Sequence, residues 1–191
     1  MNNWEDLYQE EDTHWDKGEA TPCLVDWLRD QGKDFSGRVL VPGCGFGHDV
    51  RAWAEAGFNV LGMDVAPTAI EGAQKFIQEG QVNVTFQLGD FFSPPEDLTP
   101  FDIVFEHTFF CAIQPDQRHD YVNRLLKWLK PGGHYLAINY FLPKDEEGPP
   151  FGTDREEIIE RFSPHLQLVN DWVPRSWEHR EGKERMFLWK R

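Results

Sequence analysis

Three glycines at alternate positions form the part of this chain best suited to hold a nucleotide. Gly43, Gly45 and Gly47 follow an apolar run and precede a helical pattern, and Asp64 ends the next apolar run. Glycines allow a sharp turn and let a ligand lie against bare main chain. An acid at the tip of the second strand can accept hydrogen bonds from both hydroxyls of a ribose. The pattern therefore predicts a strand–loop–helix–strand unit that binds a nucleotide.

The spacing of the glycines distinguishes between two nucleotide cofactors. Dinucleotide sites typically carry Gly-x-Gly-x-x-Gly, whereas this chain carries Gly-x-Gly-x-Gly. The spacing favours S-adenosylmethionine. An NAD-binding oxidoreductase stays open as an alternative here, because a glycine-rich loop followed by an acid also fits a dinucleotide.

Apolar runs and helical patterns alternate along the chain, which predicts a mostly parallel sheet with helices on both faces. The expected strands are 38–41, 58–63, 83–87, 102–106, 134–141, 166–172 and 184–190, the last two as a hairpin at the sheet edge. The expected helices are 5–11, 22–31, 48–56, 66–78, 115–129 and 154–162, with a tight turn at 130–133. Seven strands with a late antiparallel pair are the plan of the Rossmann-like α/β class I S-adenosylmethionine-dependent methyltransferases.

Polar side chains at the carboxyl ends of the expected strands are the candidates for the site, because ligands bind there in open parallel sheets. Besides Asp64, they are Asp90 after the third strand, Glu106 and His107 after the fourth, and Tyr140 at the end of the fifth. Asp90 suits the exocyclic amine of adenine, which is a donor. Glu106 suits the amino or sulfonium charge of the cofactor. A turn acid and a solvated strand-end acid are the plainer alternatives for these two.

Aromatic side chains gather before the core, among acids. Trp4, Tyr8 and Trp15 must pack on something, because large apolar patches are seldom left exposed. One alternative is a helix fixed to the core. The other is a lid whose rings meet the cofactor, since cations favour aromatic faces. We predict one methyltransferase domain over residues 1–191, with a lid or helical extension at 1–30, a catalytic core at 37–191, and a mobile first segment without cofactor.

Composition narrows the class of partner. The chain has 33 acids against 19 bases, a net charge of −14 and no basic block, which argues against nucleic acid and favours a small-molecule substrate. No apolar stretch is long enough to span a bilayer, and no signal peptide is evident, so we expect a soluble, cytoplasmic monomer with no membrane partner. Cys23, Cys44 and Cys111 match neither a zinc pattern nor a disulfide framework, and no metal is expected.

The chain resembles the thiopurine S-methyltransferase superfamily, and within it the halide/thiol ("harmless to ozone layer") methyltransferases. The resemblance rests on segments 15–22, 41–50, 109–113 and 148–151, which read WDKGEATP, VPGCGFGHDV, FFCAI and GPPF. It implies methyl transfer from S-adenosylmethionine, leaving S-adenosylhomocysteine, to a thiol, hydrosulfide, thiocyanate or halide. By position, the cofactor contacts of the family fall on Trp4, Tyr8, Trp15, Gly43, Asp64, Asp90, Phe91 and Glu106.

The same resemblance points to two residues for the methyl acceptor. Tyr140 matches a pocket tyrosine and could direct its hydroxyl at the nucleophile. His107 stands where the halide/thiol group tends to have tyrosine and thiopurine enzymes have arginine. With an ordinary pKa of about 6.5, His107 could serve as base towards a neutral thiol or as hydrogen-bond donor. A residue that only lines the pocket is the plainer alternative.

The negative net charge bears on which acceptor is bound. It slows the approach of anions, so a local cation such as Arg118 or Arg175 would have to offset it. A thiopurine or other aromatic thiol therefore remains the second candidate acceptor. A domain that binds the cofactor without turnover is the third alternative.

Overall fold

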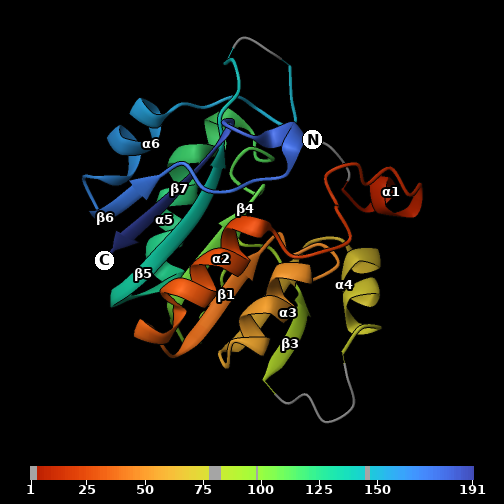
Figure 1. The fold of residues 1–191 in the computed structure, drawn as a ribbon. Coiled ribbons are helices and arrows are strands. Elements are labelled where there is room, and N and C mark those ends of the chain that lie inside the picture. Colours follow the sequence, from red (N-terminus) through yellow and green to blue (C-terminus); the bar gives the residue numbers. More distant parts are fainter. Residues whose placement is uncertain (1–3, 78–82, 98, 145–146) are drawn as a thin grey trace.

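A seven-stranded sheet forms the centre of the computed structural model, which describes residues 4–77, 83–97, 99–144 and 147–191 (Figure 1). The strand order is β3-β2-β1-β4-β5-β7-β6. The strands are β1 Arg38–Pro42, β2 Asn59–Asp64, β3 Val84–Leu88, β4 Phe101–His107, β5 Leu129–Tyr140, β6 Gln167–Trp172 and β7 Glu184–Lys190. Strands β1 to β5 pair in parallel, and β7 pairs antiparallel with both β5 and β6. The predicted seven-stranded, mostly parallel sheet with a late antiparallel pair is confirmed, and β3 and β6 are its edge strands.

Helices cover both faces of the sheet, as predicted. They are α1 Trp4–Gln9, α2 Pro22–Asp30, α3 His48–Glu55, α4 Pro67–Gln74, α5 Arg118–Trp128 and α6 Arg155–Phe162, with short 3₁₀ turns η1 Gly32–Asp34, η2 Pro115–Gln117 and η3 Glu178–Arg180. Side chains alternate between the faces of a strand. In β1, Val39 and Val41 pack in the cluster that includes α2, α3 and α4, whereas Leu40 packs in the cluster under α5 and α6.

Some predicted boundaries are corrected by the structure. Strand β5 begins at Leu129, five residues before the predicted start at His134. In its pairing with β4, Leu129 lies opposite Phe101 and His134 lies opposite Ile103. Residues 130–133 therefore form an irregularity in the ladder. Helix α4 ends at Gln74, before the predicted residue 78, which lies outside the described residues. Beyond this end Phe76 is exposed, whereas Ile77 is partly buried and packs against the core.

The N-terminal helix α1 lies apart from the sheet, beside α4 (Figure 1). The Glu5 carboxylate accepts hydrogen bonds from the backbone N–H and the hydroxyl of Thr68, at 3.0 and 2.6 Å. These bonds attach α1 to the first turn of α4. Among the described residues, no helix is long and apolar enough to cross a bilayer.

Candidate active site

The glycine loop between β1 and α3 packs directly against aromatic side chains. Gly43 and Gly45 have φ values of +61° and +52°, a region that side-chain-bearing residues rarely adopt. A Cβ atom on Gly43 would lie 2.7 Å from the Phe109 ring, and one on Gly45 would lie 3.0 Å from the Tyr8 hydroxyl. The loop therefore requires glycine for its conformation and, at Gly43, for space.

The Gly43→Ala substitution should destabilise the fold by roughly 2 kcal/mol, because backbone strain and a collision with Phe109 act together. Gly132→Ala is the matched control: its φ is +80° and nothing lies within 4 Å of the added methyl group, so only strain of roughly 1 kcal/mol is expected. Urea unfolding of both variants measures the difference. Equal losses would show that the contact with Phe109 is unimportant.

Asp64 ends β2 and holds the glycine loop in place. Its side chain is 6 % exposed, and its two carboxylate oxygens accept the backbone N–H groups of Gly45 (2.9 Å) and Ala66 (3.0 Å). Burial raises the pKa of Asp64, and these two hydrogen bonds oppose that rise. Each oxygen keeps a lone pair for a further donor, so the residue can hold the loop and bind a hydroxyl at once.

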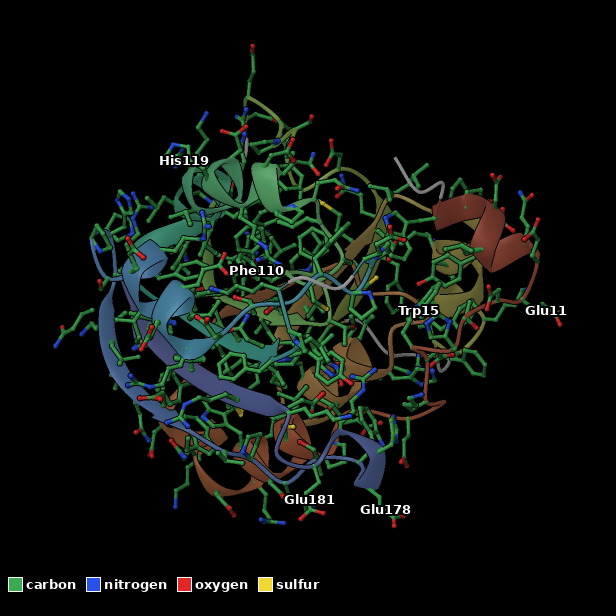
Figure 2. All side chains as sticks on the ribbon, turned by 90° about the horizontal axis from the view of Figure 1, so that it is seen from above. Glu11, Trp15, Phe110, His119, Glu178 and Glu181 are labelled. Atoms are coloured by element: carbon green, nitrogen blue, oxygen red, sulfur yellow. The ribbon has the colours of Figure 1, made fainter. Side chains whose placement is uncertain are left out.

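A hollow opens beside this loop. Its lining includes five sequence candidates: Tyr8, Trp15, Gly43, Gly45 and His107. The remaining lining residues are Asp16, Lys17, Glu19, Val41, Cys44, Phe46, His48, Asp49, Thr108 and Trp177. The N-terminal segment, the glycine loop and the ends of β4 and η3 thus converge on one space. Figure 2 shows Trp15 on the side of the fold that carries α1.

The aromatic residues near α1 form one cluster. Trp15 meets Trp4 and Tyr8 edge-on, with ring centroids 5.4 and 5.7 Å apart. Tyr8 is buried and also meets the ring of Phe46, 5.2 Å away. Trp4 therefore supports Trp15 from behind, while Tyr8 and Trp15 line the hollow.

Asp90, the candidate for adenine, and Phe91, a further cofactor candidate, are not among the residues that line the hollow. Asp90 is exposed and bonds within its own turn, to the N–H of Phe92 and the hydroxyl of Ser93. The Phe91 ring is buried and stacks on Tyr121, with centroids 4.9 Å apart. Phe91 can therefore offer a ligand its main chain, and its ring belongs to the core.

Glu106 is fully buried and supports the turn that follows β4. One of its oxygens accepts the N–H groups of Phe109 (3.1 Å) and Phe110 (3.0 Å), and the other accepts the amide of Asn139 (3.0 Å). Burial raises the pKa of Glu106 to about 7. Thr108, inside this turn, has a φ of +60°, a strained conformation that the two bonds help to hold.

His107 lies between two carboxylates. Its Nδ1 is 3.2 Å from Asp49, in the first turn of α3, and its Nε2 is 3.4 Å from Glu184, at the start of β7. The ring stacks on Trp177 at a centroid distance of 5.8 Å. Burial alone would lower the pKa of His107, but the hydrogen bonds to Asp49 and Glu184 outweigh it and raise the pKa to about 9.

Arg180 is the cation beside His107, and the sequence analysis missed it. Its Nη1 lies 3.1 Å from Glu184 and 3.2 Å from the Nε2 of His107, and its guanidinium lies 5.3 Å from the centre of the Tyr140 ring. The two arginines named from the sequence are engaged elsewhere. Arg118 bonds to Glu157 and to two carbonyl groups, and Arg175 bonds to Asp26 at the surface.

Comparison with known proteins decides between the two nucleotide cofactors. A model of the family described as thiopurine S-methyltransferase matches residues 1–191. The chain belongs to this family. It is therefore an S-adenosylmethionine-dependent methyltransferase, and the NAD alternative is excluded.

Relatives and solved structures agree with this assignment. The chain is 34 % identical to thiocyanate methyltransferase 1 of Arabidopsis thaliana, over 98 % of this chain and 84 % of that protein. It is 30 % identical to a thiopurine S-methyltransferase of Legionella pneumophila, over 81 % and 77 %. A Burkholderia thailandensis 1,6-didemethyltoxoflavin-N1-methyltransferase with bound S-adenosylhomocysteine has the same fold, with a TM-score of 0.77 at 18 % identity over 99 % and 85 %.

The residues present fit the cofactor of the family. Only glycine fits the loop at Gly43, and a hollow opens beside Gly43 and Gly45. The buried carboxylate of Asp64, which has spare lone pairs, accepts the N–H of Gly45. Aromatic rings suited to a sulfonium cation, those of Tyr8 and Trp15, line the same hollow.

Proposed function

We propose that this protein methylates a small soft nucleophile: a thiol, hydrosulfide, thiocyanate or halide. The observation that carries the proposal is the positive charge of Arg180 next to His107, which lines the hollow. The Arg180 guanidinium also contacts the rings of Trp177 and Tyr140. The name of the Arabidopsis relative, thiocyanate methyltransferase 1, supports an acceptor of this kind.

We propose roles for the residues expected to hold the cofactor, of which Gly43, Gly45, Tyr8 and Trp15 line the hollow. We assign Asp64 to the ribose hydroxyls, the main chain of Gly43 and Gly45 to the adjoining part of the cofactor, and Asp90 with the Phe91 main chain to adenine. The cofactor supplies an electrophilic methyl group on a sulfonium. Tyr8 and Trp15 exclude water around that charge, with Trp4 behind them. Glu106 positions the turn at 108–110.

The acceptor side needs positioning more than acid–base chemistry. A thiolate, thiocyanate or halide is already a nucleophile, so the protein has to orient it and exclude water. Since His107 faces two carboxylates, its charged form is favoured, and a charged imidazole donates hydrogen bonds but cannot remove a proton. Both ring nitrogens of His107 face carboxylates, so among the three roles considered the geometry favours a residue that lines the pocket, here one that carries positive charge. We assign Tyr140 to the wall beside the acceptor.

Methyl transfer to iodide, thiocyanate, hydrosulfide, an aromatic thiol and a thiopurine tests this proposal, with volatile products measured by headspace gas chromatography. We expect turnover of the small nucleophiles at a higher kcat/KM than of the thiopurine. A preference for the thiopurine would move the assignment to the second candidate acceptor. Tight binding of S-adenosylhomocysteine without turnover of any acceptor would favour a binding domain.

We further propose that the protein acts as a cytoplasmic monomer on small molecules, without nucleic-acid or membrane partners. The support is electrostatic: a net charge of −14 repels phosphate backbones and anionic lipid surfaces alike.

A further inference from the structure

Arg180 is a buried cation in a turn whose neighbours face solvent. It is 6 % exposed, whereas Glu178 and Glu181 lie at the rim of the molecule (Figure 2). Its guanidinium lies 5.3 Å from the ring centre of Tyr140 and 5.4 Å from that of Trp177. His107 and Trp177 both line the hollow, so the guanidinium adjoins two of the side chains that border that space.

Part of the guanidinium is engaged and part is available. Nη1 donates to Glu184 and lies against His107. Within the described residues, Nε and Nη2 of Arg180 have no hydrogen-bond partner. The arginine nitrogens that are sealed from solvent without a partner are Arg118 Nε and Arg161 Nε, so the free donors of Arg180 still border accessible space.

The surrounding charges leave this position receptive to an anion. Glu184, 1 % exposed, has both oxygens occupied, one by Arg180 and His107 and the other by the Cys23 thiol. With His107 protonated, the positive charges of His107 and Arg180 balance the negative charges of Asp49 and Glu184. An incoming anion therefore meets two positive charges, in spite of the acidic surface. The free N–H donors belong to Arg180, because both ring nitrogens of His107 face Asp49 and Glu184.

We propose that Arg180 binds the methyl acceptor as an anion, through its Nε and Nη2 edge, and so selects small anionic nucleophiles over neutral ones. This inference rests on the proposed function. A thiol would lose its proton to solvent before or on binding, because nearby positive charge favours the thiolate. A lone pair of the bound anion then forms the bond to the methyl carbon as the sulfonium C–S bond breaks and its electron pair passes to sulfur. Two neutral products result, and no proton is transferred in the site.

Thiocyanate is the probe for this proposal, because it is an anion at every accessible pH. Its binding to the S-adenosylhomocysteine-loaded protein is measured by calorimetry and by the infrared C≡N stretch, which responds to a hydrogen-bonded guanidinium. We expect Arg180→Gln to weaken thiocyanate binding roughly 30-fold, as for loss of a buried charged donor pair. Arg180→Lys keeps the charge and the ion pair with Glu184 but loses the planar set of N–H donors, so its affinity for thiocyanate should be intermediate.

Lys183→Gln is the matched control. Lys183 is an exposed cation three residues away, so its loss changes the net charge equally and should leave thiocyanate affinity within about twofold. Affinity for S-adenosylhomocysteine should be unchanged in all three variants. Parental thiocyanate affinity in Arg180→Gln, or an equal loss in Lys183→Gln, would overturn the proposal. If turnover of a thiol does not depend on Arg180, the anion site is refuted and the proposed function stands. If thiocyanate binding depends on Arg180 but no acceptor is turned over, the proposed function is refuted and the anion site stands.

Discussion

Replacement of Asp64 with alanine is expected to weaken the binding of S-adenosylhomocysteine by at least roughly 100-fold. The substitution removes the carboxylate that accepts the backbone N–H of Gly45 in the glycine loop. Two hydrogen bonds from hydroxyls to a charged acceptor contribute roughly 3 kcal/mol together, and tenfold in affinity corresponds to about 1.4 kcal/mol. The N–H groups of Gly45 and Ala66 also lose their partner, so the loop itself becomes less ordered.

Isothermal calorimetry measures this loss directly, without dependence on the acceptor. Asp64→Asn keeps the shape of the side chain and one acceptor oxygen, and should lie between the parent and Asp64→Ala. Glu55→Ala removes an equal charge from an exposed position of α3 and should leave affinity unchanged. Parental affinity in Asp64→Ala would show that the cofactor does not use this carboxylate.

The sheet and the loop could be predicted because their determinants are local. Alternation in Val39, Leu40 and Val41 assigns each side chain to one face of β1, and the glycines require a turn directly after it. The mostly parallel sheet and the late antiparallel pair followed from the α/β class, whereas the strand order β3-β2-β1-β4-β5-β7-β6 was not predicted. The start of β5 was wrong because Leu129 pairs with Phe101 across an irregularity that residues 130–133 create, and pairing across strands is not a local property.

The charged residues that surround His107 could not be predicted for the same reason. Arg180 and Glu184 belong to the run EHREGKE at 178–184, which has the composition of a solvated turn. Asp49 was interpreted only as part of the glycine motif. These residues become a site because η3, α3 and β7 converge on His107. Periodicity shows which residues face a sheet, but it does not show which loops meet above its edge. The burial of the Phe91 ring was missed because a residue after a strand can turn towards either layer.

The stability of the protein should fall as the pH rises from about 6.5 to about 9, because His107 loses its proton over that range. In the folded protein the pKa of His107 is raised to about 9, against 6.5 for an ordinary histidine. The folded state therefore binds this proton more tightly, and its stabilising effect is complete below pH 6.5 and lost above pH 9. The size is on the order of 3 kcal/mol at 1.36 kcal/mol per pKa unit. Burial alone would raise the pKa of Glu184, but its hydrogen bond to His107 outweighs this and helps to lower the pKa to about 2. Both shifts reflect the same ion pair, so the free energy from Glu184 is not added to that from His107.

Urea unfolding at a series of pH values, compared between the parent and His107→Gln, isolates this effect. Asp49, Glu184 and Arg180 face the imidazole, and only Glu106 nearby titrates close to the same range. Burial raises the pKa of Glu106 from 4.5 to about 7, against a lowering effect of the His107 charge. Its stabilising effect is lost as the pH rises towards 7, and because His107→Gln changes it, the two curves are compared above that pH. The difference between the two curves should shrink above pH 6.5 and vanish near pH 9. His119→Gln, at an exposed position of α5 (Figure 2), should run parallel to the parent. A constant difference between parent and His107→Gln would mean that His107 is neutral in the fold, and the positive charge offered to the acceptor would then come from Arg180 alone.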